Sequence, residues 1–211
     1  MNILVTGGSR GIGKSIVDRF TKTNHYVYCP TRSELDLNTK VILSRADFDI
    51  VINNAGINPL KTIEDISDEE VMRVNYLSPF EIIQQCLPHM VSQKFGRIIN
   101  IGSIWIDLAK PKRAAYSASK HALHSLTKSL TAEYAKYNIL SNTISPGFIG
   151  TDLTYQNNSK EEIERLISNI PVGRMGTSEE VANLVYDLTI SNTFISGQNI
   201  VIDGGYTCTA H

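Results

Sequence analysis

The stretch Thr6-Gly7-Gly8-Ser9-Arg10-Gly11-Ile12-Gly13 decides the fold of this chain. An apolar, strand-like run from Ile3 to Thr6 leads into it, and a helical pattern from about Gly11 to Thr23 follows it. This order of strand, turn and helix is the context in which a glycine-rich turn binds a dinucleotide. Glycines permit the tight turn and let backbone N–H groups approach a pyrophosphate at the positive end of the helix. A turn that serves only to pack the helix on the strand is the alternative.

Further short β-branched runs alternate with segments of helical period along the rest of the chain. Continuously apolar strands separated by helices predict an α/β protein, a Rossmann-type doubly wound parallel sheet with helices on both faces. Residues 31–49 leave room for a very short helix or none, so one βα unit is expected to be trimmed. The expected strands are Ile3–Thr6, Tyr26–Cys29, Ile50–Asn53, Arg97–Ile101, Ser141–Ser145 and Asn199–Ile202, and the expected helices are Gly11–Thr23, Ser67–Gln93, Ala115–Tyr137, Lys160–Ser168 and Ser178–Ser191, with Ser67 and Ser178 as N-caps.

Composition excludes several classes of protein. The 211 residues show no repeat, low-complexity tract or linker, so residues 1–211 are expected to form a single domain. A formal net charge of -1 argues against nucleic-acid binding. The first apolar run is too short for a signal peptide, and no run approaches the roughly 20 apolar residues of a membrane span, so we expect a cytoplasmic protein. Three scattered cysteines predict neither disulfides nor a thiolate metal site.

A second informative group of residues is Tyr116-Ser117-Ala118-Ser119-Lys120. The phenol and the ammonium are four residues apart near the start of an expected helix, so both project from one face. A nearby positive charge lowers the pKa of a tyrosine, which then exchanges a proton with a carbonyl oxygen near neutral pH. The spacing alone also fits a packed tyrosine beside a surface lysine. Ser103, at the end of an apolar strand, favours the catalytic interpretation, because ligands bind at the carboxyl ends of parallel strands.

Together these motifs resemble those of the short-chain dehydrogenases/reductases, from Asn2 to Gly205. The resemblance implies hydride transfer between nicotinamide and a carbonyl or alcohol carbon. It also implies four catalytic residues: Tyr116 protonates the carbonyl oxygen, Ser103 polarises it, Lys120 lowers the pKa of Tyr116 and holds the nicotinamide ribose, and Asn75 supports a water chain. The cofactor-binding residues that it implies are Gly7, Ser9, Arg10, Gly11, Ile12, Gly13, Thr31, Arg32, Asp36, Asn54, Ala55, Gly56, Tyr116, Lys120, Pro146, Gly147, Ile149 and Thr151.

The expected cofactor is NADP(H) in preference to NAD(H). Thr31 stands where an acidic residue would accept hydrogen bonds from a free ribose 2′-hydroxyl. Arg10 and Arg32 occupy the two places where the family puts positive charge for a 2′-phosphate, and guanidinium groups suit phosphate. Glu34 complicates the local field, and both arginines could be solvated.

For the substrate, a small carbonyl or alcohol compound, the chain most resembles 3-oxoacyl-(acyl-carrier-protein) reductases, for example at Pro171 to Gly176. Arg174 falls where those enzymes keep a carrier-docking arginine, but Ala132 replaces a second one. Sugar, polyol and other ketone reductases share the framework. A nucleotide-sensing protein without catalysis is disfavoured by the intact catalytic residues, and an epimerase or dehydratase by the TGxxxGxG spacing of the glycines.

The remaining charged residues admit a plain interpretation. Lys110, Lys112 and Arg113 could receive an anionic substrate, but a run of charge is usually a solvated face, which we favour here. His121 and His124 have a metal-compatible spacing but no third ligand, so no metal is expected. The long helix that carries them packs against its copy in the family, which implies a homo-oligomer, a tetramer or a dimer.

Overall fold

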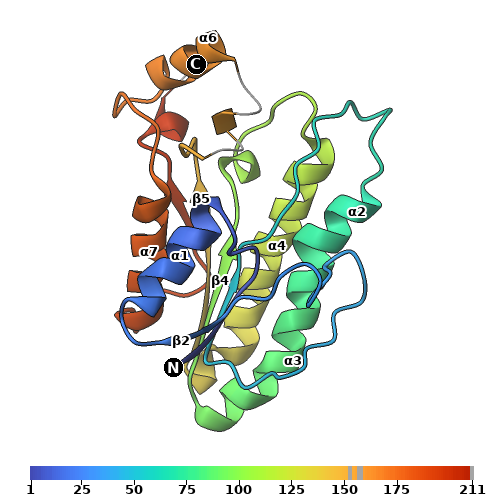
Figure 1. Ribbon diagram of the computed structural model, residues 1–211, viewed down its shortest axis with the longest axis vertical. Coiled ribbons are helices and arrows are strands. Elements are labelled where there is room, and N and C mark those ends of the chain that lie inside the picture. Colours follow the sequence, from blue (N-terminus) through green and yellow to red (C-terminus); the bar gives the residue numbers. More distant parts are fainter. Residues whose placement is uncertain (152–153, 156–158, 210–211) are drawn as a thin grey trace.

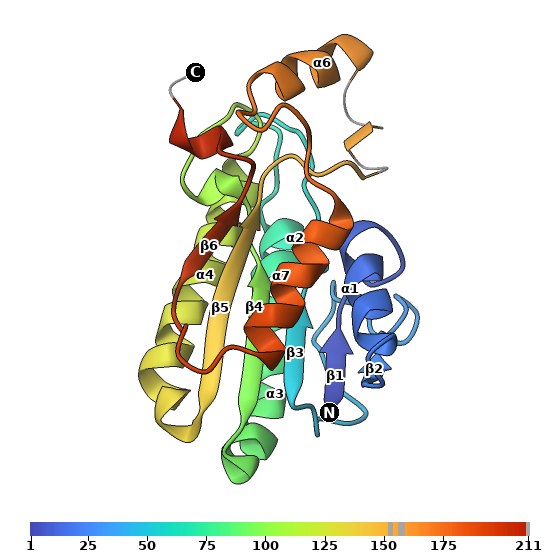
Figure 2. The same cartoon turned by 90° about the vertical axis from the view of Figure 1, so that its left-hand side faces the viewer.

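A six-stranded, wholly parallel sheet forms the centre of the computed structural model, which describes residues 1–151, 154–155 and 159–209 (Figures 1 and 2). The strands stand in the order β2-β1-β3-β4-β5-β6, and every neighbouring pair is parallel. The predicted fold class is thereby confirmed. The strand bounds are β1 Asn2–Val5, β2 Tyr26–Tyr28, β3 Ile50–Asn53, β4 Gly96–Ile101, β5 Ile139–Pro146 and β6 Asn199–Ile202.

The sheet reverses its direction of growth between β1 and β3. From β1 the chain passes to β2 on one side, and β3 then pairs with β1 on the other side. Such a reversal opens a crevice at the carboxyl ends of the two strands where their connections diverge. The glycine-rich turn follows β1 and Asn54 follows β3, so the fold itself places both at this crevice.

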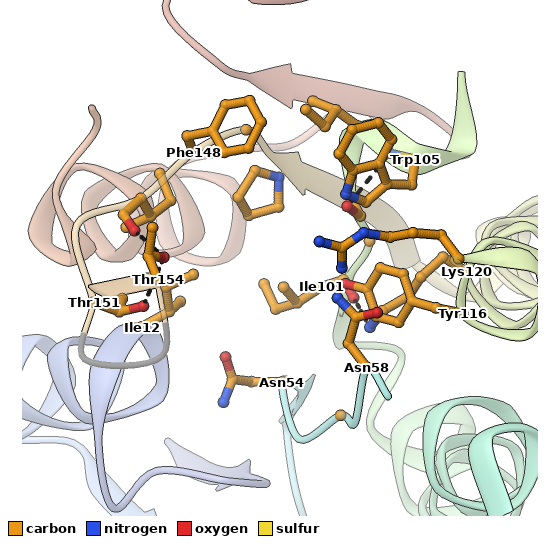
Figure 3. A pocket seen from close by; sticks show the side chains of 18 of the residues that line it. Ile12, Asn54, Asn58, Ile101, Trp105, Tyr116, Lys120, Phe148, Thr151 and Thr154 are labelled. Atoms are coloured by element: carbon orange, nitrogen blue, oxygen red, sulfur yellow. Dashed lines mark hydrogen bonds between the residues drawn. The ribbon is translucent and has the colours of Figure 1, made fainter. Parts of the chain in front are cut away.

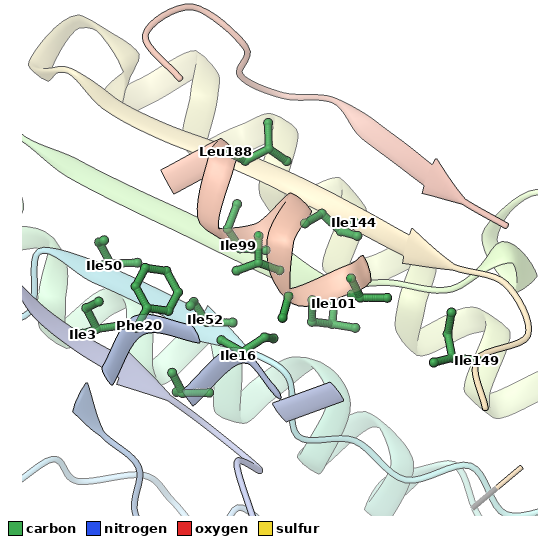
Figure 4. Close-up of a cluster of buried hydrophobic side chains, with 14 residues drawn as sticks. Ile3, Ile16, Phe20, Ile50, Ile52, Ile99, Ile101, Ile144, Ile149 and Leu188 are labelled. Carbon is green, nitrogen blue, oxygen red and sulfur yellow. The ribbon is translucent and has the colours of Figure 1, made fainter. Parts of the chain in front are cut away.

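Helices cover both faces of the sheet. On one face, α1 (Gly11–Thr21) and α7 (Ser178–Ile190) pack on a fully apolar cluster that includes Ile16, Phe20 and Val185 (Figures 2 and 4). On the other face, α3 (Ser78–Gln93) and α4 (Ala114–Tyr134) bury a second apolar cluster. The short helix α6 (Lys160–Ser168) lies beyond the carboxyl edge of the sheet. Among the residues in the described ranges, no helix is both long enough and apolar enough to cross a membrane.

The expected trimmed unit is present between β2 and β3, where residues 29–49 form no helix. Val41 and Phe48 of this segment are buried and pack against the cluster beneath α3. The segment is tied to that helix by hydrogen bonds from the Val41 N–H to Glu81 Oε2 (2.8 Å) and from the Leu43 N–H to Gln85 Oε1 (3.0 Å). Side chains of α3 thus satisfy backbone groups that a helix would otherwise satisfy internally.

The expected helix from Ser67 to Gln93 has a different start and an irregular interior. It begins as α2 (Glu69–Met72), with Asp68 and not Ser67 at the N-cap, and passes through a π-helical turn (Arg73–Leu77) into α3. Asp68 already has helical backbone angles, and its side chain makes no capping hydrogen bond. Single-turn π-helices recur at functional sites.

The N-cap of α7 is Thr177 and not the expected Ser178. The Thr177 hydroxyl accepts a hydrogen bond from the Glu180 N–H (3.1 Å), and the Glu180 carboxylate accepts one from the Thr177 N–H (2.8 Å). This reciprocal pair needs an acidic residue three positions after the cap. Ser178 has Val181 at that position, so the sequence signal was one residue earlier than we expected.

Candidate active site

A continuous groove runs along the carboxyl edge of the sheet. Its first part lies between the glycine-rich turn and the end of β2, its second part over the turn and α1, and its third part between β4, α4 and β5. Gly56 lines all three parts, and Ile12, Asn54 and Thr151 line the last two. All eighteen residues that the sequence predicted for cofactor binding line this groove. Its length and position suit an extended dinucleotide.

The glycine-rich turn has the features that a pyrophosphate needs. Gly7 and Gly11 have φ values of +67° and +52°, in the left-handed region that favours glycine. A Cβ on Gly7 would also lie 2.9 Å from Ala55 Cα. The first turn of α1 contains no acidic residue, and Arg10 at its N-cap makes no capping hydrogen bond. None of the described residues that line this part of the groove is acidic, so the helix N-terminus fits the pyrophosphate of a dinucleotide cofactor.

Asn54 joins this turn to the end of β3. Its side-chain amide donates to the carbonyl oxygens of Thr6 (3.0 Å) and Gly7 (2.9 Å). In return, the Thr6 hydroxyl accepts hydrogen bonds from the N–H groups of Asn54 and Ala55, each at 3.1 Å. Thr6 was not among the predicted site residues, although its place at the end of the first strand is visible in the sequence. These bonds fix the two sides of the crevice relative to each other.

Tyr116 and Ser103 both line the third part of the groove. Tyr116 lies there opposite Thr151 and Thr154 (Figure 3). Ser103 follows β4, and its hydroxyl accepts a hydrogen bond from the Trp105 N–H (3.3 Å). Burial raises the pKa of the Tyr116 phenol, whereas its hydrogen bond with Ser103 and the positive charge of Arg113 act to lower that pKa. The phenol is thus protonated at neutral pH and can donate a proton.

Lys120 is buried one helical turn after Tyr116. Its ammonium donates a hydrogen bond to the Ile101 carbonyl oxygen (2.7 Å) and lies 5.6 Å from the centroid of the Tyr116 ring. Burial lowers the pKa of Lys120 to about 8. The cation that lowers the pKa of Tyr116 in this structure is Arg113, and the expected effect of Lys120 on that pKa stays a prediction.

The shifted pKa of Lys120 predicts a specific pH dependence of stability. Between about pH 8 and the ordinary lysine pKa of 10.5, the unfolded chain binds a proton that the folded protein does not. The free energy of unfolding should therefore rise with pH in this window, by up to about 1.4 kcal/mol per pH unit. Below the window the cost of burying the charged ammonium is fully present and does not change with pH. We expect urea denaturation of the cofactor-free protein to show this rise in the wild type and its loss in Lys120→Met. Lys128→Met, at an exposed position of the same helix, should retain the rise. If the free energy of unfolding changed with pH in the same way in all three proteins, Lys120 would not be the group responsible.

Asn75 lies in the π-helical turn and is completely buried. Its side-chain amide donates to the Ile57 carbonyl oxygen (2.9 Å) and to Ser119 Oγ (3.0 Å), and its oxygen accepts from the Ile57 N–H (2.9 Å). Ser119 Oγ in turn donates to the Tyr116 carbonyl oxygen (2.7 Å). A Cβ on Gly56 would lie 3.2 Å from Asn75 Oδ1 and 3.4 Å from Lys120 Nζ, so Asn75 and Lys120 flank the same backbone.

The groove beside β2 contains charges of both signs. Arg32 Nε lies 3.7 Å from Asp36 Oδ1, and the Arg32 side chain is 77% exposed. The Glu34 carboxylate accepts hydrogen bonds from the Thr31 N–H (2.7 Å) and the Thr31 hydroxyl (2.8 Å). Arg10, by contrast, makes no ion pair with any residue in the described part of the chain. Of the two predicted phosphate-binding arginines, Arg10 is the one whose charge is not paired by any described residue.

The interpretation of Lys110, Lys112 and Arg113 as a solvated face is wrong for Arg113. Lys112 is exposed, but the Arg113 side chain is half-buried against Trp105 and lines the pocket that contains Tyr116. Asn58, which sequence reasoning did not identify, lines the same pocket and lies beside Tyr116 (Figure 3). No spacing rule marks either residue: Arg113 is brought in by packing on Trp105, and Asn58 by the loop that follows β3.

Comparisons with known proteins agree with this geometry. The sequence profile of the family described as enoyl-(acyl carrier protein) reductase matches residues 36–207. The chain is 32% identical to the 3-oxoacyl-(acyl-carrier-protein) reductase of Buchnera aphidicola, with 98% of this chain and 97% of the relative covered. That alignment extends over 237 positions, more than the 211 residues of this chain, so the relative has residues that this chain lacks.

Solved structures show the same architecture. A 4-hydroxyisoleucine dehydrogenase mutant complexed with NADH and succinate has a TM-score of 0.89 and 30% identity, with both chains fully covered. A gluconate 5-dehydrogenase from Burkholderia cenocepacia in complex with NADP and tartrate has a TM-score of 0.85 and 26% identity, with 99% of this chain and 96% of that chain covered. By its motifs, its fold and these matches, the chain belongs to the short-chain dehydrogenase/reductase family of oxidoreductases.

Proposed function

We propose that this protein is an NADP(H)-dependent oxidoreductase that interconverts a carbonyl compound and the corresponding alcohol, in a single domain. The observation that carries the proposal is that Ser103, Tyr116 and Lys120 gather in one pocket, at the end of a groove that fits a dinucleotide. When bound there, the nicotinamide supplies or accepts the hydride.

The chain's own residues position and polarise the reacting oxygen. Tyr116 donates a proton to the carbonyl oxygen during reduction and accepts it during oxidation. Ser103 lies within hydrogen-bond reach of the phenol, and when substrate is bound its single O–H donates to the carbonyl oxygen and stabilises the charge developing there. Lys120 binds the nicotinamide ribose, and Asn75, through Ser119, holds the first turn of α4 in place.

The preference for NADP(H) rests on Arg10 and Arg32. Removing a charged hydrogen-bond donor from a phosphate costs roughly 1.5–3 kcal/mol, about 10-fold to 100-fold in affinity. We therefore expect Arg10→Ala to weaken NADPH binding by this factor in a fluorescence titration and to leave NADH binding nearly unchanged. Lys22→Ala, at the opposite end of α1, is the control and should bind both cofactors as the wild type does. If Arg10→Ala lost affinity for NADPH and NADH equally, the arginine would bind the pyrophosphate instead of the 2′-phosphate.

Two substrate classes have support. Similarity to 3-oxoacyl-(acyl-carrier-protein) reductases over nearly the whole chain favours a 3-oxoacyl thioester. Arg174, the residue expected to dock the carrier, is held in a two-point ion pair with Glu180 at 2.9 and 2.7 Å, which weakens that support. The structural neighbours complexed with succinate and tartrate favour a smaller hydroxy or oxo acid. NADPH oxidation on addition of an acetoacetyl thioester or of free acetoacetate tests the proposed reaction and separates the two classes.

Other functions make different predictions. A nucleotide-sensing protein would bind NADPH but would not oxidise it, whichever carbonyl compound is added. An epimerase would retain tightly bound NAD through purification. The expected cytoplasmic location and homo-oligomer stay predictions, and the oligomer is tested by light scattering of the purified protein.

A further inference from the structure

The pocket around Tyr116 holds more positive charge than hydride transfer needs. Its described lining residues include Lys110, Arg113 and Lys120, and none of them is an aspartate or glutamate. Lys120 is engaged with the Ile101 carbonyl oxygen and serves the proposed reaction. The charges of Lys110 and Arg113 remain, and positive charge in a cleft raises the local concentration of anions.

Arg113 is the more informative of these two cations. Its guanidinium carbon lies 5.4 Å from the centroid of the Trp105 ring, so the indole supports one side of the group. Its Nε atom is buried and has no hydrogen-bond partner among the described residues. No acidic side chain in the described ranges forms an ion pair with it. A half-buried guanidinium is ordinarily paired, because burial of an unpaired charge is costly.

Asn58 provides a second unsatisfied polar group in the same pocket. Its Oδ1 atom is buried and without a hydrogen-bond partner in the described part of the chain. Figure 3 shows Asn58, Tyr116 and Trp105 along one wall of the pocket, facing Ile12 and Thr151 across it. A side-chain amide both donates and accepts hydrogen bonds, so it can bind a carboxylate oxygen or a hydroxyl group of a substrate.

The size and spacing of these groups limit the ligand. The cavity has a volume of about 270 Å³, part of which the nicotinamide must occupy. Arg113 is the N-cap of α4, three residues before Tyr116, and both side chains line this cavity. The positive charge of Arg113 already acts on the Tyr116 phenol. A ligand bound to both groups therefore has its anionic group only a few bonds from its carbonyl carbon.

We infer that Arg113, with Lys110 and Asn58 beside it, forms a carboxylate subsite, and that the substrates are a short-chain oxo acid and the corresponding hydroxy acid. The planar guanidinium, supported by the indole, offers paired N–H donors to a planar carboxylate. This inference rests on the proposed function and narrows its substrate, because an acyl thioester lacks a free carboxylate. Overall, an oxo acid, a reduced nicotinamide cofactor and a proton give the hydroxy acid and the oxidised cofactor. Hydride adds to the carbonyl carbon, and the Tyr116 proton is transferred to its oxygen.

Binding of a small acid tests the subsite without turnover. We would titrate malonate, malonamide and inorganic phosphate into the complex with NADPH, using the wild type, Arg113→Met and Lys112→Met. Lys112 is the matched control, since it is an exposed cation next to Arg113 that does not line this pocket. Malonate should bind the wild type and Lys112→Met with the same affinity. Its affinity for Arg113→Met should be at least roughly 30-fold lower than for the wild type, and malonamide should not bind any of the three proteins. Equal malonate binding by Arg113→Met, or tighter binding of phosphate than of malonate, would overturn the carboxylate subsite.

Turnover tests the substrate class in the same proteins. Acetoacetate, methyl acetoacetate and the neutral N-acetylcysteamine thioester of acetoacetate carry the same ketone, and only the first is an anion. The wild type should prefer the acid in kcat/KM, and Arg113→Met should lose this preference, mostly through KM. Because Arg113 also lowers the pKa of Tyr116, the acid-to-ester ratio is the readout, since a change in that pKa affects both substrates. A thioester or ester used as well as the acid would overturn the substrate class. Reduction of none of the three by NADPH, with malonate binding intact, would count against the proposed reaction and not against the subsite.

Discussion

Replacing Tyr116 by phenylalanine is expected to lower kcat for carbonyl reduction about 10³-fold while NADPH still binds. The variant removes only the hydroxyl that we propose as the proton donor, and such general acid catalysis contributes roughly 10²–10⁴-fold. The ring itself, which packs at 5.6 Å from Lys120 Nζ, is retained. Single-turnover kinetics by stopped-flow absorbance of NADPH would report the chemical step directly.

A matched control is available on the same helix. Tyr134, at the end of α4, is remote from the pocket residues, so Tyr134→Phe should keep the wild-type rate. A Tyr116→Phe enzyme with an unchanged single-turnover rate would remove Tyr116 from the mechanism. If NADPH binding were lost as well, the phenol would be a cofactor ligand first and a proton donor second.

A methyl group added at Gly13 should destabilise the protein by about 3 kcal/mol or more and abolish cofactor binding, since the rigid core does not absorb such overpacking. The new Cβ would overlap the Gly7 carbonyl oxygen and the Asn54 side-chain amide. Those two groups are hydrogen-bonded to each other across the crevice at 2.9 Å. Gly13→Ala must therefore move either the glycine-rich turn or the end of β3. Urea denaturation and a fluorescence titration with NADPH measure the two effects.

Gly173→Ala provides the comparison for Gly13→Ala. Gly173 has a φ of +77°, and nothing lies within 4 Å of the position that an added methyl group would take, so the substitution meets backbone strain but no steric overlap. Its cost should be about 1–2 kcal/mol, and NADPH binding should survive. If both variants were equally stable, the contact between Gly13, Gly7 and Asn54 would be looser than the structure shows.

The sequence predicted the parts of the fold that depend on local pattern. Buried strands such as β3 consist mostly of a continuous apolar run, here Ile50 to Ile52, and each expected strand is found within one or two residues of its predicted bounds. The order of the motifs along the chain was enough to place Ser103, Tyr116 and Lys120 at one edge, because parallel strands present their carboxyl ends together. The absence of a helix between β2 and β3 followed from the shortness of the segment.

Features that depend on tertiary packing could not be predicted in this way. The burial of Arg113 follows from Trp105, eight residues earlier, whose ring covers the guanidinium; a run of three cations gives no sign of this. The hydrogen bonds from Thr31 to Glu34 place a carboxylate at the end of β2, although the strand itself ends in no acidic residue. The caps at Asp68 and Thr177 differ from the expected residues by a single position, a scale at which pattern reasoning is least accurate.

The π-helical turn at Arg73–Leu77 makes the active site sensitive to the number of residues in a helix as well as to their identity. Each residue of an α-helix advances the chain by about 1.5 Å and rotates it by about 100°. Loss of one residue between Glu69 and Ser78 could leave a regular helix while turning Asn75 away from Ile57 and Ser119. A relative that keeps the same asparagine but has one residue more or fewer in this interval would present another side chain to Ile57 and Ser119. In aligning such relatives, the count of residues in the interval therefore matters as much as the asparagine itself.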